Sequence, residues 1–101
     1  MSYFGGFIFK NITSFGDSPT ISITDSSASS YTMSSGNSYA LLQNVGDSIA
    51  WFGSSDVNPA TGVGNYLVPG ERLILEHAQA GVEVYFKCAS GDTTTIGVVE
   101  A

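Results

Sequence analysis

The chain has 101 residues, a formal net charge of −6 and only three basic side chains: Lys10, Arg72 and Lys87. A chain of this length makes one domain, and three dispersed basic residues cannot form the positive face that binds nucleic acid or an anionic membrane. The sequence therefore predicts a single acidic domain over 1–101 with no nucleic acid and no membrane as partner.

The N-terminal segment 1–10 holds four aromatic rings and a glycine pair, Gly5-Gly6. One interpretation is an ordinary first strand, in which alternation turns Phe7 and Phe9 toward the core. The other is an arm that leaves the domain, hinges at the glycine pair and anchors its rings on a neighbouring subunit. Both interpretations stay open. The second makes four residues candidates for an interface: Tyr3, Phe4, Phe7 and Phe9.

Strand patterns dominate the rest of the chain. Apolar residues alternate with polar ones, as at Ile21 and Ile23, and this period of two is typical of half-buried strands. Segments 39–43 and 48–52 are more continuously apolar, which is typical of strands covered on both faces. The predicted strands are 19–24, 39–43, 48–52, 72–76, 82–88 and 93–99. Short strands at such regular spacing indicate an all-β sandwich or barrel.

The fourth of these strands has an alternative. Segment 71–80 contains good helix formers and fits a short helix as well as a strand. We favour the strand, because the turn pair Pro69-Gly70 precedes the segment and Gly81 follows it closely.

Turn residues separate the predicted strands. Gly46 can take the positive φ that a hairpin with a bulge requires. Pro69-Gly70 fits the central positions of a type II turn, since proline fixes φ at the first and glycine accepts positive φ at the second. The loop 53–64 has few apolar side chains, and the serine-rich segment 25–38 is either a crossover between sheets or an exposed mobile loop. Similar glycine-containing breaks lie at 80–81 and 90–92.

Little in the sequence indicates chemistry. His77 is the only histidine and no GxSxG pattern is present, so we expect no catalytic residues and no enzyme. Asp47, Asp56 and Asn58 carry oxygen ligands, but their spacing matches no known calcium loop, so no metal or other cofactor is expected. Cys88 is the single cysteine, and its place in an apolar strand indicates a buried thiol.

Trp51 and Phe52 are the large aromatic residues of the third predicted strand. Alternation places their rings on opposite faces. We expect both in the core, the alternative being that one of them faces a partner. In that alternative a sugar could stack on the ring, with Asn58, Asn65 and Tyr66 as flanking groups.

A family resemblance appears between 44 and 71. The chain reads NVGDSIAWFGSSDVN at 44–58, TGVG at 61–64 and YLVPGE at 66–71. This succession resembles a pattern in small virion proteins of tailed bacteriophages, N-x-G-x-x-x-x-x-x-G-x-S-x-V followed by T-x-x-G-x-x-L-x-P-G-E. The matching positions are Gly53, Ser55, Val57, Thr61, Gly64, Leu67, Pro69, Gly70 and Glu71.

The resemblance implies an antiparallel β-sandwich of jelly-roll type with about seven or eight short strands. It further implies a capsid decoration, or cement, protein that binds the major capsid protein or another virion protein on the outer surface of the phage head. Such a protein would be a homo-oligomer, for example a trimer, and would stabilise the shell. The N-terminus lacks the regions of a secretory signal, so synthesis in the host cytoplasm is expected.

Two alternatives remain beside decoration. The first is a neck, tail or head-fibre component, and the second is a carbohydrate-binding module. The regions expected to make contact are the N-terminal aromatic segment and the loop 53–64 with its neighbours, which adds four interface candidates: Trp51, Asp56, Asn58 and Tyr66.

Overall fold

The computed structural model describes residues 3–4, 7–8, 20–79 and 81–101 of the chain. In the N-terminal segment, β1 (Tyr3–Phe4) pairs in antiparallel fashion with β2 (Phe7–Ile8). The description there covers the backbone only. Phe9 and the proposed hinge Gly5-Gly6 lie outside the described residues.

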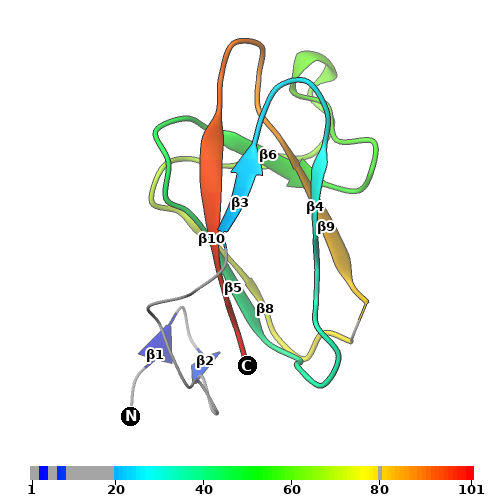
Figure 1. Ribbon diagram of the computed structural model, residues 1–101, viewed down its shortest axis with the longest axis vertical. Coiled ribbons are helices and arrows are strands. Elements are labelled where there is room, and N and C mark those ends of the chain that lie inside the picture. The colour runs from blue at the N-terminus through cyan, green and yellow to red at the C-terminus, as the bar shows by residue number, and fades with distance from the viewer. Residues whose placement is uncertain (1–2, 5–6, 9–19, 80) are drawn as a thin grey trace.

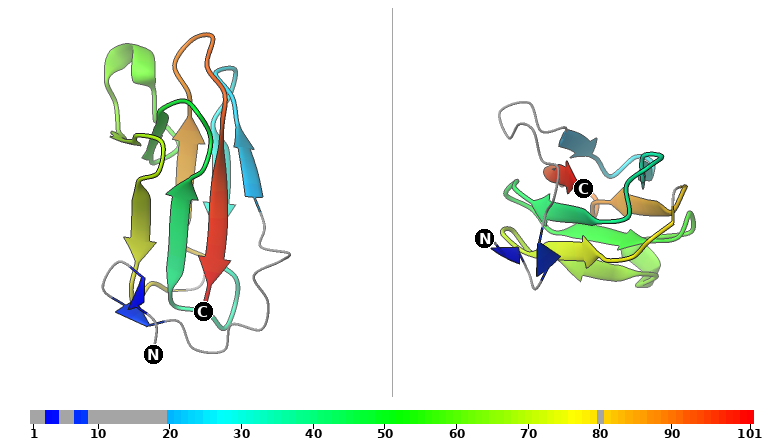
Figure 2. Two further views of the ribbon diagram at one scale, coloured as in Figure 1. Left: turned by 90° about the vertical axis from the view of Figure 1, so that its left-hand side faces the viewer. Right: turned by 90° about the horizontal axis from the view of Figure 1, so that it is seen from below.

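The remaining strands form two antiparallel sheets of four, which pack face to face (Figures 1 and 2). The first sheet has the order β3 (Thr20–Ile23), β10 (Thr94–Glu100), β5 (Ala40–Asn44), β8 (Arg72–Leu75). The second has the order β4 (Ser29–Thr32), β9 (Glu83–Lys87), β6 (Ala50–Gly53), β7 (Asn65–Leu67).

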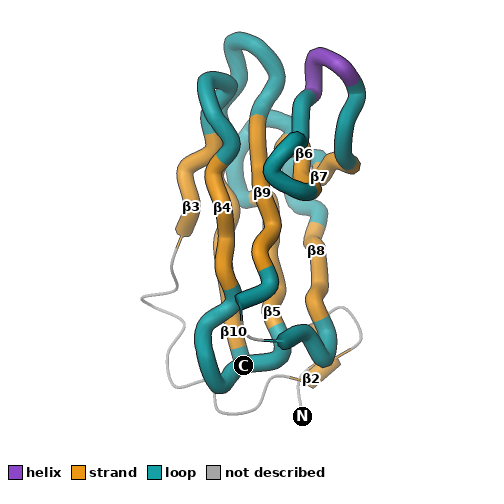
Figure 3. The backbone as a smooth tube through the Cα atoms, turned by 90° about the vertical axis from the view of Figure 1, so that its right-hand side faces the viewer, coloured by secondary structure: helices purple, strands orange, loops and turns teal. Residues whose placement is uncertain are grey.

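The strand pairs are nested along the chain. From the outside inward, β3 pairs with β10, β4 with β9, β5 with β8 and β6 with β7. This is the pattern of one long hairpin wound into a barrel-like sandwich, and with eight strands in two sheets it is the jelly roll. Its tip is the β6–β7 loop, which contains a short 3₁₀ turn at Pro59–Thr61 (Figure 3). The predicted fold class is confirmed.

The winding corrects the expected role of Gly46. The chain around it joins β5 to β6, which lie in different sheets, so this connection is a corner between sheets and not a hairpin. Gly46 does not have positive φ either. A glycine is needed for another reason: a Cβ there would collide with Thr94 Oγ1 and lie 2.8 Å from the backbone nitrogen of Thr95. The expected turn at Pro69-Gly70 is present, with Gly70 at φ 90° and the Glu71 amide bonded to the Val68 carbonyl at 2.9 Å.

Two strands were missed by the sequence analysis. β4 lies in the serine-rich segment and turns only Tyr31 fully into the core, so its alternation is too weak to see. β7 has three residues, of which only Leu67 is buried. Within the segment 71–80, Arg72–Leu75 form the strand β8 and not a helix, as favoured.

The core lies between the two sheets and is made of inward-facing residues from both. The expectation that 39–43 is covered on both faces is confirmed, because the alternating neighbours Leu41 and Leu42 are both buried. For 48–52 it is wrong, since only Ala50 of β6 is buried. Cys88 is buried, as predicted. The largest fully buried side chains are Phe86, Ile23, Leu42, Ile96, Asn44 and Cys88.

Candidate functional site

The outer face of the second sheet carries an aromatic pair. In β6, Ala50 and Phe52 point into the core, and the Phe52 ring lies 6.3 Å from that of Phe86. Alternation therefore turns Trp51 outward, where it is half-buried and faces Tyr66 in register on β7. The two ring centroids are 5.4 Å apart with planes inclined by 45°. The expectation of two core rings holds for Phe52 and is wrong for Trp51.

Apolar exposure extends along this edge of the sheet. Ile49 directly precedes β6 and Val68 directly follows β7, so continued alternation places them beside Trp51 and Tyr66. Tyr66 is 54% exposed, Ile49 39% and Val68 37%. These four side chains form a strip without charged groups, called here the β6–β7 strip. Exposed contiguous apolar surface of this kind is characteristic of an interaction site.

A polar cleft lies next to the β6–β7 strip, on the side of β9. Lys87 on β9 is the cross-strand neighbour of Trp51 and marks the boundary between the two features. Three connections meet here, at the upper end of the molecule in Figure 1: β3–β4, β6–β7 and β9–β10. They enclose a cavity of about 140 Å³, called here the loop cleft, lined by Asp25, Asn58, Pro59, Ala60, Lys87, Cys88, Ala89 and Ser90.

Hydrogen bonds hold the walls of the loop cleft. Asp25 Oδ2 accepts from the Gly91 amide at 2.8 Å, which ties the β3–β4 connection to the β9–β10 connection. Asn58 caps the 3₁₀ turn by accepting from the Ala60 amide at 3.1 Å, and its backbone bridges to Val63. Each of the two polar side chains is thus fixed by one of its atoms, and its second polar atom is left for other contacts.

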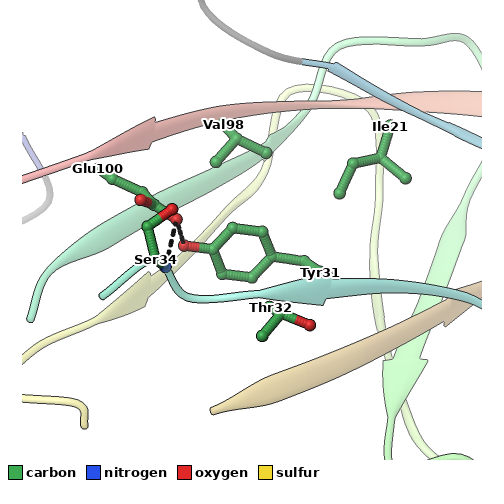
Figure 4. Close-up of a pocket in the computed structure, with 6 residues that line it drawn as sticks. All are labelled: Ile21, Tyr31, Thr32, Ser34, Val98 and Glu100. Carbon is green, nitrogen blue, oxygen red and sulfur yellow. Dashed lines mark hydrogen bonds between the residues drawn. The ribbon is translucent and has the colours of Figure 1, made fainter. Parts of the chain in front are cut away.

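A second cavity lies at the opposite edge of the sandwich, between the edge strands β3 and β4. It has a volume of about 340 Å³ and is lined by Ile21, Tyr31, Thr32, Ser34, Val98 and Glu100 (Figure 4). Its two titratable side chains, those of Tyr31 and Glu100, are hydrogen-bonded to each other. The Tyr31 hydroxyl donates to the Glu100 carboxylate, which also accepts from Asn37 Nδ2 at 2.8 Å and from the Ser34 amide at 3.3 Å.

This network perturbs both titratable groups. Burial, with the hydrogen bond and the charge of Glu100, raises the pKa of Tyr31 far above its usual range. Burial also opposes ionisation of Glu100, but the hydrogen bonds from Tyr31, Asn37 and Ser34 outweigh it and hold the pKa of the Glu100 carboxyl below its ordinary value. The arrangement fastens the last strand to β4, and we interpret it as structural.

The remaining sequence candidates do not converge on one site. His77 Nδ1 lies 3.2 Å from the Tyr39 hydroxyl, and the two rings meet edge to face at 5.1 Å. Asp47 lies in the β5–β6 corner, whereas Asp56 lies in the β6–β7 loop. Among the described residues, no group of three or more histidine, cysteine, aspartate or glutamate side chains could hold a metal ion. Burial and the charges of Asp92 and Asp25 raise the pKa of the Cys88 thiol.

Of the eight predicted interface residues, the structure pairs Trp51 with Tyr66 and places Asn58 in the loop cleft. Asp56 is exposed and lies outside both features. The side chains of Tyr3, Phe4 and Phe7 are not described, and neither is any part of Phe9. The sequence analysis missed the cleft residues Asp25, Lys87 and Ser90, because only the strand register brings them together.

The chain matches no protein family, no curated protein and no solved structure. In the described parts of the chain, no helix is long and apolar enough to cross a membrane. Fold and surface features therefore define the class of protein: an all-β jelly-roll domain with an exposed apolar strip and an adjoining polar cleft.

Proposed function

We propose that this chain is a capsid decoration protein of a tailed bacteriophage, which binds the outside of the head and stabilises the shell. The observation that carries the proposal is the β6–β7 strip. Exposed aromatic and aliphatic residues on a rigid sheet face are the usual anchors of protein interfaces. The partner is the major capsid protein, and copies of the chain associate with one another on the lattice.

Three further features support the proposal. The motif between 44 and 71 resembles small phage virion proteins, and the jelly roll is a common fold among viral capsid domains. Within this motif, Val57 and Leu67 are buried, and Pro69-Gly70 forms the turn from β7 into β8. A repeated lattice also multiplies weak contacts, so a small surface suffices for tight binding.

The first experiment is a count of copies per purified virion, relative to the major capsid protein, by quantitative mass spectrometry. A ratio near that of the capsid subunits is expected for decoration. A ratio lower by orders of magnitude would replace decoration with a neck, tail or head-fibre role. Absence from the particle would overturn the virion assignment.

A binding assay then tests the strip itself. Trp51→Ala and Tyr66→Ala should each abolish sedimentation of the purified chain with capsids that lack it. Thr32→Ala is the matched control, because Thr32 is exposed on the same sheet face but on β4 at the opposite edge. Retained binding by both aromatic variants would show that another surface makes the contact.

A further inference from the structure

We infer that the loop cleft binds a neutral sugar residue. The inference does not depend on decoration of a capsid, and it rests on residues outside the β6–β7 strip. Four polar side chains line the cleft: Asp25, Asn58 and Ser90 come from three separate connections, and Lys87 comes from the end of β9. They combine a carboxylate, an amide, an ammonium and a hydroxyl within about 140 Å³.

Two of these side chains, Asp25 and Asn58, are held in place before any ligand arrives. Asp25 uses Oδ2 to accept from the Gly91 amide, which leaves Oδ1 as an acceptor. Asn58 uses Oδ1 to accept from the Ala60 amide, which leaves the Nδ2 group as a donor. Within the part of the chain that the structure describes, neither of these atoms nor the Lys87 ammonium has a hydrogen-bond or ion-pair partner. A ligand therefore meets two fixed groups, Asp25 and Asn58, and spends little free energy on ordering them.

The charges decide the chemical class of the ligand. The Lys87 ammonium would repel a metal cation, and the Asp25 carboxylate would repel an anion such as phosphate, so either kind of ion is repelled by one of the two charged side chains. A neutral ligand that both donates and accepts hydrogen bonds can bond to the Asp25 carboxylate and to the Lys87 ammonium at the same time. Neighbouring hydroxyl groups on a sugar ring do this, because each hydroxyl is donor and acceptor at once. They would donate to Asp25 and accept from Lys87 and Asn58.

The size of the cleft limits how much of a glycan it holds. About 140 Å³ is well below the range of roughly 300–1,000 Å³ typical of pockets that enclose a whole small molecule. The cleft therefore takes part of a single ring, and a longer glycan would continue into solvent. The site thus fits an exposed terminal sugar of a cell-surface or secreted polysaccharide.

The test is a titration of the isotopically labelled full chain with D-glucose, D-galactose, D-mannose and N-acetyl-D-glucosamine, followed by NMR. At least one of these sugars should shift the backbone amides of Ala60, Ser90 and Gly91 in a saturable manner. Sodium phosphate and calcium chloride are the charged probes and should leave these amides unshifted. No saturable shift with any of the four sugars, or saturable binding of only a charged probe, would overturn the inference.

Variants separate the cleft from the rest of the surface. Asp25→Asn keeps an oxygen for the Gly91 amide but lowers the affinity for the sugar about tenfold or more, since a charge-assisted hydrogen bond is lost. Lys87→Met keeps the apolar stem and should have a similar effect. Asp56→Asn is the matched control, with the same change of charge at an exposed residue outside the cleft, and equal affinity of the Asp25→Asn and Asp56→Asn proteins would refute the assignment.

The same variants distinguish this inference from the proposed function. Trp51→Ala should lose capsid binding and keep sugar binding, whereas Asp25→Asn should keep capsid binding and lose sugar binding. Loss of sugar binding in Trp51→Ala, with binding intact in Asp25→Asn, would move the sugar from the cleft to the strip and overturn the assignment.

Discussion

Asn44 offers the sharpest test of how the fold is held together. It lies at the end of β5 and has no exposed surface. Its Nδ2 group donates to the carbonyls of Ser48 at 2.8 Å and Leu67 at 2.9 Å. Its Oδ1 accepts from the Gly46 amide at 3.2 Å and from the Thr94 hydroxyl at 2.7 Å. One side chain thus joins the β5–β6 corner, the end of β7 and the start of β10.

The expected cost of losing this side chain follows from its four hydrogen bonds. At about 1 kcal/mol net for each bond, Asn44→Ala should lower the free energy of unfolding by about 4 kcal/mol. A domain of this kind has a total of about 5–15 kcal/mol, so the loss is a large fraction. With about 4–8 °C per kcal/mol for a domain of this length, the melting temperature should fall by about 15 to 30 °C.

Urea denaturation followed by Trp51 fluorescence measures this loss. The midpoint should fall while the slope of the transition stays unchanged, which shows that stability and not the unfolded state has changed. Gln43→Ala is the matched control, because the neighbouring Gln43 side chain makes one exposed bond, to the Gly70 carbonyl at 3.1 Å. The control should lose about 0.5 kcal/mol.

A further variant separates hydrogen bonding from packing. Asn44→Leu fills a similar volume with an apolar side chain and leaves the same four groups without partners, so it should be about as unstable as Asn44→Ala. The reasoning would be refuted if Asn44→Leu were as stable as the native protein, or if Asn44→Ala lost no more than Gln43→Ala.

Three other predictions concern single positions. Gly46→Ala should lower the free energy of unfolding by about 1–3 kcal/mol, because the added Cβ collides with the start of β10. The control Gly97→Ala should be neutral or slightly stabilising, because its Cβ would make only ordinary van der Waals contacts with Val45 at 3.6 Å and beyond. The pKa of the Glu100 carboxyl is lowered in the folded state, so its contribution to stability is present above the ordinary value of 4.5 and is lost as pH falls through the pKa of the folded state. The destabilisation by Glu100→Gln should therefore be large in urea titrations at pH 7 and smaller at pH 3. A destabilisation that does not change with pH would contradict the assignment. Cys88 should react with a thiol reagent only at the rate of unfolding, and rapid modification of the native protein would contradict its burial.

The fold class could be predicted because most strands have a clear period. Ile21 and Ile23 in β3, or Val84 and Phe86 in β9, alternate with polar residues and occupy the core as the pattern indicates. The division of strands between sheets could not be predicted in this way. A glycine such as Gly46 suits a hairpin and a corner equally well in sequence, and only the contact with Thr94 on a strand 48 residues later decides between them.

The aromatic pair of the β6–β7 strip could be predicted in part. Trp51 and Tyr66 were candidates because large aromatic rings are common at interfaces, but alternation alone does not say which of Trp51 and Phe52 faces outward. The inward side of β6 is fixed by the packing of Phe52 against Phe86, which depends on the partner strand. Local sequence carries no information about that partner.

The loop cleft follows from the winding of the chain. When two strands pair with two later strands in nested order, the connection between the first two must lie beside the connection between the last two. β3 pairs with β10 and β4 with β9, so Asp25 in the first connection must come close to Ser90 and Gly91 in the other. The sequence does not predict this juxtaposition of the two connections, because it does not reveal β4. With Tyr31 as its one deeply buried residue, β4 has the pattern of a serine-rich loop, and without β4 the nested pairing is not apparent.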